Sequence, residues 1–260
     1  MLRLSAARGD LFSVLGLPRE FDAQSCAGYK SLLFSRMLTE DDDSTLSYAG
    51  IYFPWLIVRD AADDQPGAIR SVAPDATILG SIAALTIASG AWFAPGNQLL
   101  KGVVDLDPPT TDRAPYIFFD NHLNLVVQES PGFLAMSSFT LSPSSQLEDI
   151  NVRRLLILLR RLALREGVDY VFQPNDRAFW RIVQRRFEEV LGGLFLRGAF
   201  AGTTQAESFM VRTDSSVNPP ESVAQGRFIV EIRVAPSLPL EFLTVRLLQS
   251  GGDLSFSEET

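Results

Sequence analysis

The end of the chain carries the pattern that most restricts its fold. Residues 227–234, "RFIVEIRV", alternate so that Phe228, Val230, Ile232 and Val234 point to one face of a strand. Residues 241–248, "EFLTVRLL", form a second strand candidate with apolar residues on both faces. Prolines at 236 and 239 exclude a two-residue hairpin turn between them and favour an extended connection. Two interpretations stay open: the last strand returns to its own sheet by a longer loop, or it adds to the sheet of a neighbouring molecule.

Two long helices are predicted ahead of these strands. Apolar residues recur at spacings of three and four over residues 151–165 and again over 177–196. Asn175 or Asp176 can cap the second helix, because a side-chain oxygen there accepts an unpaired amide of the first turn. Similar spacing predicts helices within 9–17 and over 22–38.

Segments rich in β-branched and aromatic residues predict the strands of the remaining chain. Residues 46–60 indicate a largely buried strand interrupted near Pro54. The other strand candidates are "KGVVDL", "NLVVQE", "GFLAMSSFTL", "VDYVFQP" as a buried strand, and "FMVRTD". Helices mixed with strands in this order predict an α/β (α+β) fold with a mixed β-sheet flanked by helices.

Residues 76–100 carry no charge until Lys101, which is long enough to suggest a membrane helix. Ser81, Thr86, Gly90 and Pro95 interrupt the segment, and no Lys/Arg cluster flanks it. We therefore expect a buried or interface-packed helix over about 75–89 and no membrane span.

Charge argues against a nucleic-acid partner, because the formal net charge is -8 and phosphate binding needs a basic surface. The charge is uneven, since residues 1–150 carry 9 basic and 18 acidic side chains and residues 151–260 carry 14 and 13. Arg177, Arg181 and Arg185 recur every four residues and so share one helix face. These arginines either meet solvent and the chain's own acidic half, or dock onto an acidic surface of another protein.

Enzymatic motifs are missing from the sequence. The chain has a single histidine, His122, which argues against a hydrolytic triad. It has a single cysteine, Cys26, which excludes an intrachain disulfide framework and a metal site with several cysteine ligands. No phosphate-binding glycine motif follows a strand, and the acidic run at 40–43 fails the calcium-loop template. We expect no enzyme, no cofactor and no bound metal, and the first residues show no secretory signal.

Several motifs together resemble a known family. They are, in chain order, "YFPWLIVRD", "GAWFAPGN", "KGVVDL", "INVRRLLILL", "YVFQPNDRAFWRIVQRRF", "LRGAFAG" and "VNPPESVAQGRFIVEIRVAPSLPLEFLTVRL". In this order they are similar to the C-terminal part of contractile tail sheath proteins, which include phage tail sheaths and sheath-like subunits of extracellular contractile injection systems. The similarity covers about residues 45–248.

The resemblance implies a structural protein that assembles in rings with other sheath subunits, alike or different, around an inner tube and drives contraction. It implies that Pro236 and Pro239 shape an arm and that the strand after it is donated to a neighbouring subunit. That strand comprises Glu241, Phe242, Leu243, Thr244, Val245, Arg246, Leu247 and Leu248. Candidate residues facing the tube are Arg153, Arg154, Arg160, Arg161, Arg177, Arg181 and Arg185.

The expected organisation is a helical lead-in over 1–45, a core and C-terminal domain over 46–248, and a flexible tail over 249–260. Typical sheath subunits have a preceding arm and outer domains, so we expect either a fragment or a shortened member located near a baseplate or cap. Particles of this kind assemble in the cytoplasm and are released extracellularly in some systems. The alternative is a sheath-fold adaptor, cap or baseplate-proximal component that binds one partner without forming a lattice.

Overall fold

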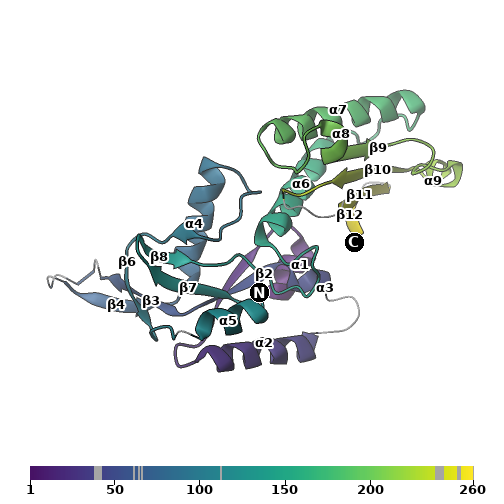
Figure 1. Ribbon diagram of the computed structural model, residues 1–260. Coiled ribbons are helices and arrows are strands. Elements are labelled where there is room, and N and C mark those ends of the chain that lie inside the picture. The colour runs from purple at the N-terminus through teal and green to yellow at the C-terminus, as the bar shows by residue number, and fades with distance from the viewer. Residues whose placement is uncertain are drawn as a thin grey trace. The chain divides into compact units, whose positions relative to one another are not determined.

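The computed structural model describes residues 1–37, 43–60, 62–63, 65, 67–111, 113–237, 243–250 and 253–259 (Figure 1). The chain divides into two compact units, residues 1–154 and 155–260. Both units combine helices and sheets, so the predicted α/β (α+β) class is confirmed.

A five-stranded mixed sheet forms the centre of the first unit, in the order β1-β2-β7-β8-β5. The strands β1, β2 and β7 are parallel, whereas β8 and β5 join as antiparallel neighbours. Their bounds are β1 Ser13–Gly16, β2 Ala49–Phe53, β7 Asn124–Glu129, β8 Gly132–Ala135 and β5 Gln98–Leu99. The strand predicted for "NLVVQE" is confirmed as β7.

Alternating side chains of this sheet enter two separate apolar clusters, because successive residues of a strand point to opposite faces. Ile51 and Phe53 join the cluster that contains residues of α2 (Ala23–Met37) and α5 (Ala114–Asp120), while Tyr52 joins the cluster that contains Ile78 and Ile82 of α4 (Asp75–Ala88). Figure 1 shows α2 and α5 on one side of the sheet and α4 on the other. The first unit therefore has a helix layer on each face of its sheet.

A three-stranded antiparallel sheet, β4-β3-β6, follows directly from β2. The chain passes from β2 to β3 through a cis peptide bond between Phe53 and Pro54, so the predicted interruption at Pro54 is confirmed. These strands are β3 Trp55–Arg59, β4 Ile69–Val72 and β6 Val103–Asp107. The helices of this unit are α1 Leu2–Arg8, α2 Ala23–Met37, α3 Asp43–Leu46, α4 Asp75–Ala88 and α5 Ala114–Asp120.

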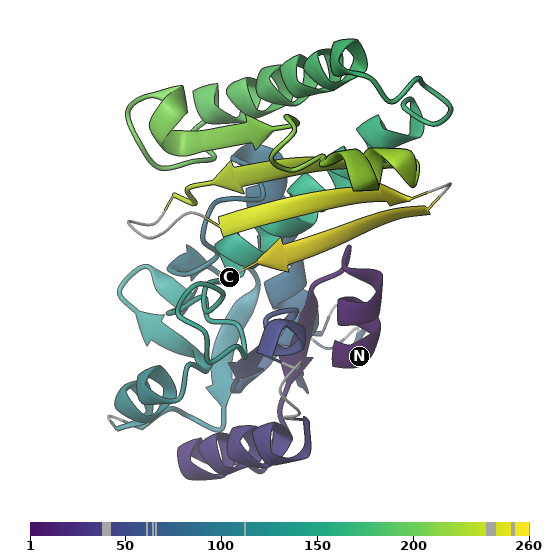
Figure 2. The ribbon, with the colours of Figure 1, turned by 90° about the vertical axis from the view of Figure 1, so that its right-hand side faces the viewer.

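The second unit combines a four-stranded antiparallel sheet, in the order β12-β11-β10-β9, with α7 packed against β9 (Figure 2). The helix α6 spans Ile150–Val168 and so begins in the first unit. The remaining elements are α7 Arg177–Leu196, α8 Gln205–Ser208, β9 Phe209–Arg212, α9 Pro220–Ala224, β10 Arg227–Val234, β11 Leu243–Ser250 and β12 Asp253–Glu259.

Two local predictions are wrong. Residues 13–16 form β1 and not a helix, because their backbone pairs in parallel with β2, and this tertiary pairing outweighs the helical spacing of the apolar residues. Residues 168–174 form no strand, since α6 continues to Val168 and successive turns follow it. Phe172 is 100% exposed there, with a φ of 68°.

The domain boundaries also differ from expectation. Leu2, Leu17 and Cys26 belong to a core cluster of the first unit, so residues 1–45 are part of that unit and not a separate lead-in. Residues 253–259 form β12, paired with β11, where a flexible tail was expected. Leu254 and Phe256 alternate with serines in this segment, which is the period of a strand.

Candidate assembly interface

The strand β10 is the centre of the candidate interface. Phe228, Val230, Ile232 and Val234 are all buried, at 0–6% exposure, which confirms the predicted apolar face. The ring of Phe228 lies 5.1 Å from that of Phe179 and 6.4 Å from that of Trp180, both on α7. The buried face of the sheet is therefore held against α7.

The terminal segment pairs with this strand within the same chain. β11 lies antiparallel to β10 over its whole length, from Arg227 opposite Ser250 to Val234 opposite Leu243. This is the return to its own sheet that the sequence left open as one interpretation. Donation of the same strand to a neighbour stays a prediction, and Glu241, Phe242 and Pro239 lie outside the described residues.

The beginning of the connecting arm is attached to its own unit. Pro236 forms an isolated bridge with Phe200. The N–H of Ala235 donates to the carbonyl of Ser208 at 2.8 Å, and the N–H of Ala201 donates to the carbonyl of Ala235 at 2.9 Å. Any rearrangement of β11 therefore starts beyond Pro236.

Side-chain amides occupy part of the opposite edge of β10, beyond the end of β9. The Nδ2 of Asn218 donates to the carbonyl of Ile229 at 2.8 Å, and its Oδ1 accepts from the N–H of Ile229 at 2.7 Å. The Nδ2 of Asn175 donates to the carbonyl of Arg227 at 3.0 Å. These bonds imitate a neighbouring strand and block strand addition at this edge. Sequence reasoning missed this role, because Asn218 before Pro219 indicates only a turn.

The other face of β10 holds a buried carboxylate. Glu231 is 2% exposed, and the Nε of Arg233 lies 2.7 Å from its Oε1. A buried carboxylate needs a charged partner of this kind, because an isolated buried charge is strongly unfavourable.

The helix α7 presents the predicted arginine stripe to solvent. Asp176 is the N-cap, and its side chain accepts from the N–H groups of Ala178 and Phe179 at 2.9 Å, so the predicted cap is confirmed. Trp180, Val183 and Phe187 are buried. The three arginines of the stripe, Arg177, Arg181 and Arg185, are exposed on the same helix.

Burial separates the arginines of α6 into two groups. Arg153 is fully buried, with its guanidinium 4.2 Å from the ring centroid of Tyr48, and Arg154 is buried and donates to Thr86 Oγ1. Neither presents charge on the surface of the chain, so the structure contradicts their proposed position facing a tube. The reason is that this turn of α6 packs inside the first unit, whereas Arg161 is exposed and Arg160 is partly exposed.

Among the described residues, no cluster of three or more His, Cys, Asp or Glu is arranged to hold a metal ion. The Nδ1 of His122 lies 3.8 Å from Glu148, and its ring stacks on Phe139 at 5.0 Å. Within the part of the chain that the structure describes, no helix combines the length and apolarity of a membrane span.

No family model and no curated protein matches the chain, whereas solved structures do. A chain from the contracted sheath complex of PVC, an extracellular contractile injection system, is 22% identical, with a TM-score of 0.73 and coverage of 88% of this chain and 61% of that one. A chain of the contracted anti-feeding prophage (AFP) baseplate is 21% identical, with a TM-score of 0.76 and coverage of 93% and 61%.

The sheath tail protein from Desulfitobacterium hafniense is 15% identical, with a TM-score of 0.61, covering 95% of this chain and 58% of that one. The chain thus spans about three fifths of the length of the sheath-related chains that it matches. The resemblance found in the sequence is confirmed at the level of the fold: this chain has the fold of contractile injection system and phage tail sheath proteins.

Proposed function

We propose that this chain is a structural sheath subunit of a contractile injection system or phage-like tail, and not an enzyme. The observation that carries the proposal is the shared fold, which covers 88% of the chain in the match to a contracted sheath complex. In this role the chain assembles with other sheath subunits, alike or different, around an inner tube. Baseplate or cap proteins are further partners, and assembly takes place in the cytoplasm before any release of the particle.

Exchange of the terminal strand is the proposed link between subunits. The β10–β11 contact is a main-chain ladder over Arg227–Val234, and the chain reaches β11 through the single connection 235–242. A neighbour's identical segment can form the same ladder, because exchange of an identical element keeps every contact. Such a ladder holds subunits together while their domains rotate as rigid bodies, which is what contraction requires.

The arginine stripe of α7 is the proposed contact with the tube. Arg177, Arg181 and Arg185 repel one another mildly, by roughly 0.2–0.5 kcal/mol per pair in an isolated helix. An acidic partner surface removes this repulsion and adds attraction. Arg160 and Arg161 stay candidates for the same role, whereas the buried Arg153 and Arg154 do not.

The alternative is a sheath-fold adaptor that binds one partner without building a lattice. The pairing of β11 with β10 of the same chain favours this role, because that pairing occupies the edge a neighbour's strand needs.

The size of the purified protein, measured by light scattering and negative-stain microscopy, distinguishes the two roles. Three forms are compared: the full-length chain, the Val245→Pro variant and a chain ending at Ser250. Proline has no backbone N–H, so Val245→Pro removes a hydrogen-bond donor from the β10–β11 pairing, opposite Ile232. The chain ending at Ser250 keeps β11 and loses β12. A sheath subunit forms rings or tubes in the full-length and Ser250 forms and not in the proline variant. Three monomers of equal stability contradict the sheath role and leave the adaptor.

A further inference from the structure

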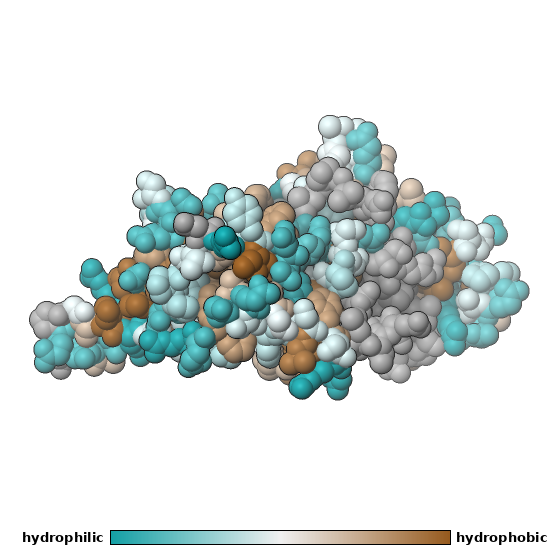
Figure 3. Space-filling view, turned by 60° about the horizontal axis from the view of Figure 1, so that its bottom comes forward, coloured by the Kyte–Doolittle hydropathy of each residue, from teal (hydrophilic) through white to brown (hydrophobic). Residues whose placement is uncertain are grey.

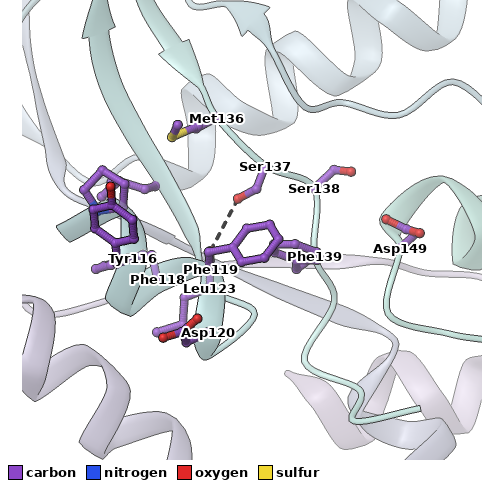
Figure 4. A pocket seen from close by; sticks show the side chains of 12 residues that line it. Tyr116, Phe118, Phe119, Asp120, Leu123, Met136, Ser137, Ser138, Phe139 and Asp149 are labelled. Atoms are coloured by element: carbon purple, nitrogen blue, oxygen red, sulfur yellow. Dashed lines mark hydrogen bonds between the residues drawn. The ribbon is translucent and has the colours of Figure 1, made fainter. Parts of the chain in front are cut away.

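A cleft in the first unit is lined by α5, the beginning of β7 and the segment 136–139, with a volume of about 530 Å³ (Figure 4). On the face of the molecule drawn in Figure 3, hydrophobic side chains lie in separate patches among hydrophilic ones. Single exposed apolar side chains are ordinary, but several gathered around a cleft indicate a binding surface. At this cleft Tyr116 is 74% exposed, Phe119 66% and Met136 51%.

The walls of the cleft are aromatic. The rings of Phe119 and Phe139 lie 5.6 Å apart in an edge-to-face arrangement. Figure 4 shows these two rings side by side, with Tyr116 and the Asp120 and Asp149 carboxylates around them. Aromatic faces carry partial negative charge, so they attract a cation placed over them.

All formal charge in the lining is negative, because it includes Asp120 and Asp149 and no Arg, Lys or His. Burial, and then the neighbouring Glu148, raise the pKa of Asp149 to about 6. Two nearby basic groups, His122 and Lys30, make other contacts. The Nδ1 of His122 lies 3.8 Å from Glu148, and the Nζ of Lys30 donates to the carbonyls of Asn121 and His122.

We propose that this cleft binds an arginine side chain presented on an apolar segment of a protein partner. A guanidinium is planar, so it can stack on the aromatic rings and pair with a carboxylate at the same time. Apolar residues beside that arginine cover the exposed ring surfaces of Tyr116 and Phe119. The site goes beyond the sheath role and does not depend on it.

Methyl NMR on the full-length chain tests the site with defined probes. The chain has four methionines, and Met136 lies in the cleft, so ¹³C-methyl labelling gives a local signal assigned with Met136→Leu. The probe is the blocked tripeptide acetyl-Leu-Arg-Leu-amide, and the matched probe has Gln in place of Arg. The Met136 methyl signal is expected to shift saturably as the Arg peptide is added, with a Kd of about 1 mM. The Kd of the Gln peptide is expected to be at least tenfold higher. The corresponding Lys peptide is expected to bind more weakly than the Arg peptide.

Two variants assign the contacts. The double variant Asp120→Asn, Asp149→Asn is expected to lower the affinity for the Arg peptide at least tenfold. The control is Glu20→Gln with Glu129→Gln, which makes the same charge change at exposed positions and should leave that affinity unchanged. Tyr116→Ala removes a largely exposed ring and should weaken binding severalfold without affecting the fold. The proposal is overturned if the Gln or Lys peptide binds as tightly as the Arg peptide. It is equally overturned if the Met136 signal does not shift at 10 mM Arg peptide, roughly ten times the expected Kd. The same holds if the Glu20→Gln, Glu129→Gln variant loses as much affinity as the Asp120→Asn, Asp149→Asn variant.

Discussion

The side-chain amide of Asn218 satisfies both backbone groups of Ile229, with an Nδ2–O distance of 2.8 Å and an N–Oδ1 distance of 2.7 Å. Because the N–H and C=O of Ile229 point toward Asn218, they point away from β11 on the other side of the strand. This part of β10 is therefore closed on one edge by a side chain and open to strand pairing on the other, where β11 lies.

Replacing Asn218 with Ala should destabilise the fold by about 2–3 kcal/mol, because two backbone groups of Ile229 lose their hydrogen-bond partner. Asn218 is 1% exposed, so water cannot easily replace the amide. Urea unfolding measures the loss. Gln225→Ala serves as control, because Gln225 is exposed and lies just before β10. This change should alter the free energy of unfolding by less than about 0.5 kcal/mol. Equal effects of the two variants would show that the amide does not hold this edge.

Arg186 and its neighbour Arg185 should behave differently. The Nε of Arg186 lies 2.7 Å from Oε2 of Glu166, and its Nη2 lies 3.3 Å from Oε1, whereas Arg185 belongs to the exposed stripe. Arg186→Ala should lower the urea midpoint, and Arg185→Ala should not.

The Arg186–Glu166 pair also has a defined pH dependence. The hydrogen bond from Arg186 lowers the pKa of Glu166. Its stabilisation is therefore complete above the unfolded pKa of about 4.3 and is lost as pH falls through the folded pKa. The difference between wild type and Arg186→Ala should shrink at acid pH, and a difference that stays constant down to about pH 2 would contradict the pairing.

Lys30 should make stability rise with pH in the alkaline range. Burial lowers the pKa of Lys30 to about 8, so between about 8 and 10.4 the unfolded chain binds more protons than the folded chain. The contribution of Lys30 to the free energy of unfolding should therefore increase over this range, whereas the buried Cys26 thiol, whose pKa burial raises to about 12, contributes in the opposite sense. The free energy of unfolding of wild type minus that of Lys30→Met should rise between about pH 8 and 10.4. Lys101→Met removes the other lysine, which is exposed, and serves as control. If wild type and Lys30→Met show parallel pH profiles, the amine is not desolvated.

The arginine stripe should act on assembly and not on folding. Changing Arg177, Arg181 and Arg185 together to Gln should leave the urea midpoint unchanged within error, because all three are exposed. The same change should reduce sedimentable assemblies formed at low salt in the presence of the tube protein. The exposed arginines Arg3, Arg36 and Arg113, changed to Gln, control for net charge. Equal loss in both triple variants would mean that total charge, and not the stripe, controls assembly.

The elements set by local pattern were predictable from the sequence. The helix over 177–196 and its cap at Asp176 were predicted because amphipathic spacing and a capping side chain are local signals. The bounds of β10 followed from the apolar residues at every second position, and the break at Pro54 from the chemistry of proline.

Features that depend on distant contacts were not predictable. Ser13–Gly16 forms a strand only because Ala49–Phe53 lies beside it. Arg153 looked like a surface residue, yet it is buried against Tyr48, more than a hundred positions away in the chain. The role of Asn218 required knowing that Ile229 lies within hydrogen-bonding distance. The cleft at Tyr116 and Asp149 likewise joins segments that no sequence motif connects.

A mixed-chain disulfide experiment tests strand exchange most directly. Ile229 and Leu248 are register partners, and because the backbone groups of Ile229 point away from β11, they form a non-hydrogen-bonded pair with close Cβ atoms. In chains carrying Cys26→Ala, a tagged Ile229→Cys form is mixed with an untagged Leu248→Cys form and oxidised. Strand exchange predicts a disulfide-linked dimer of one tagged and one untagged chain. A crosslink that forms only when both cysteines are in one chain, with no product between chains, would contradict the exchange and leave β11 as a strand of its own sheet.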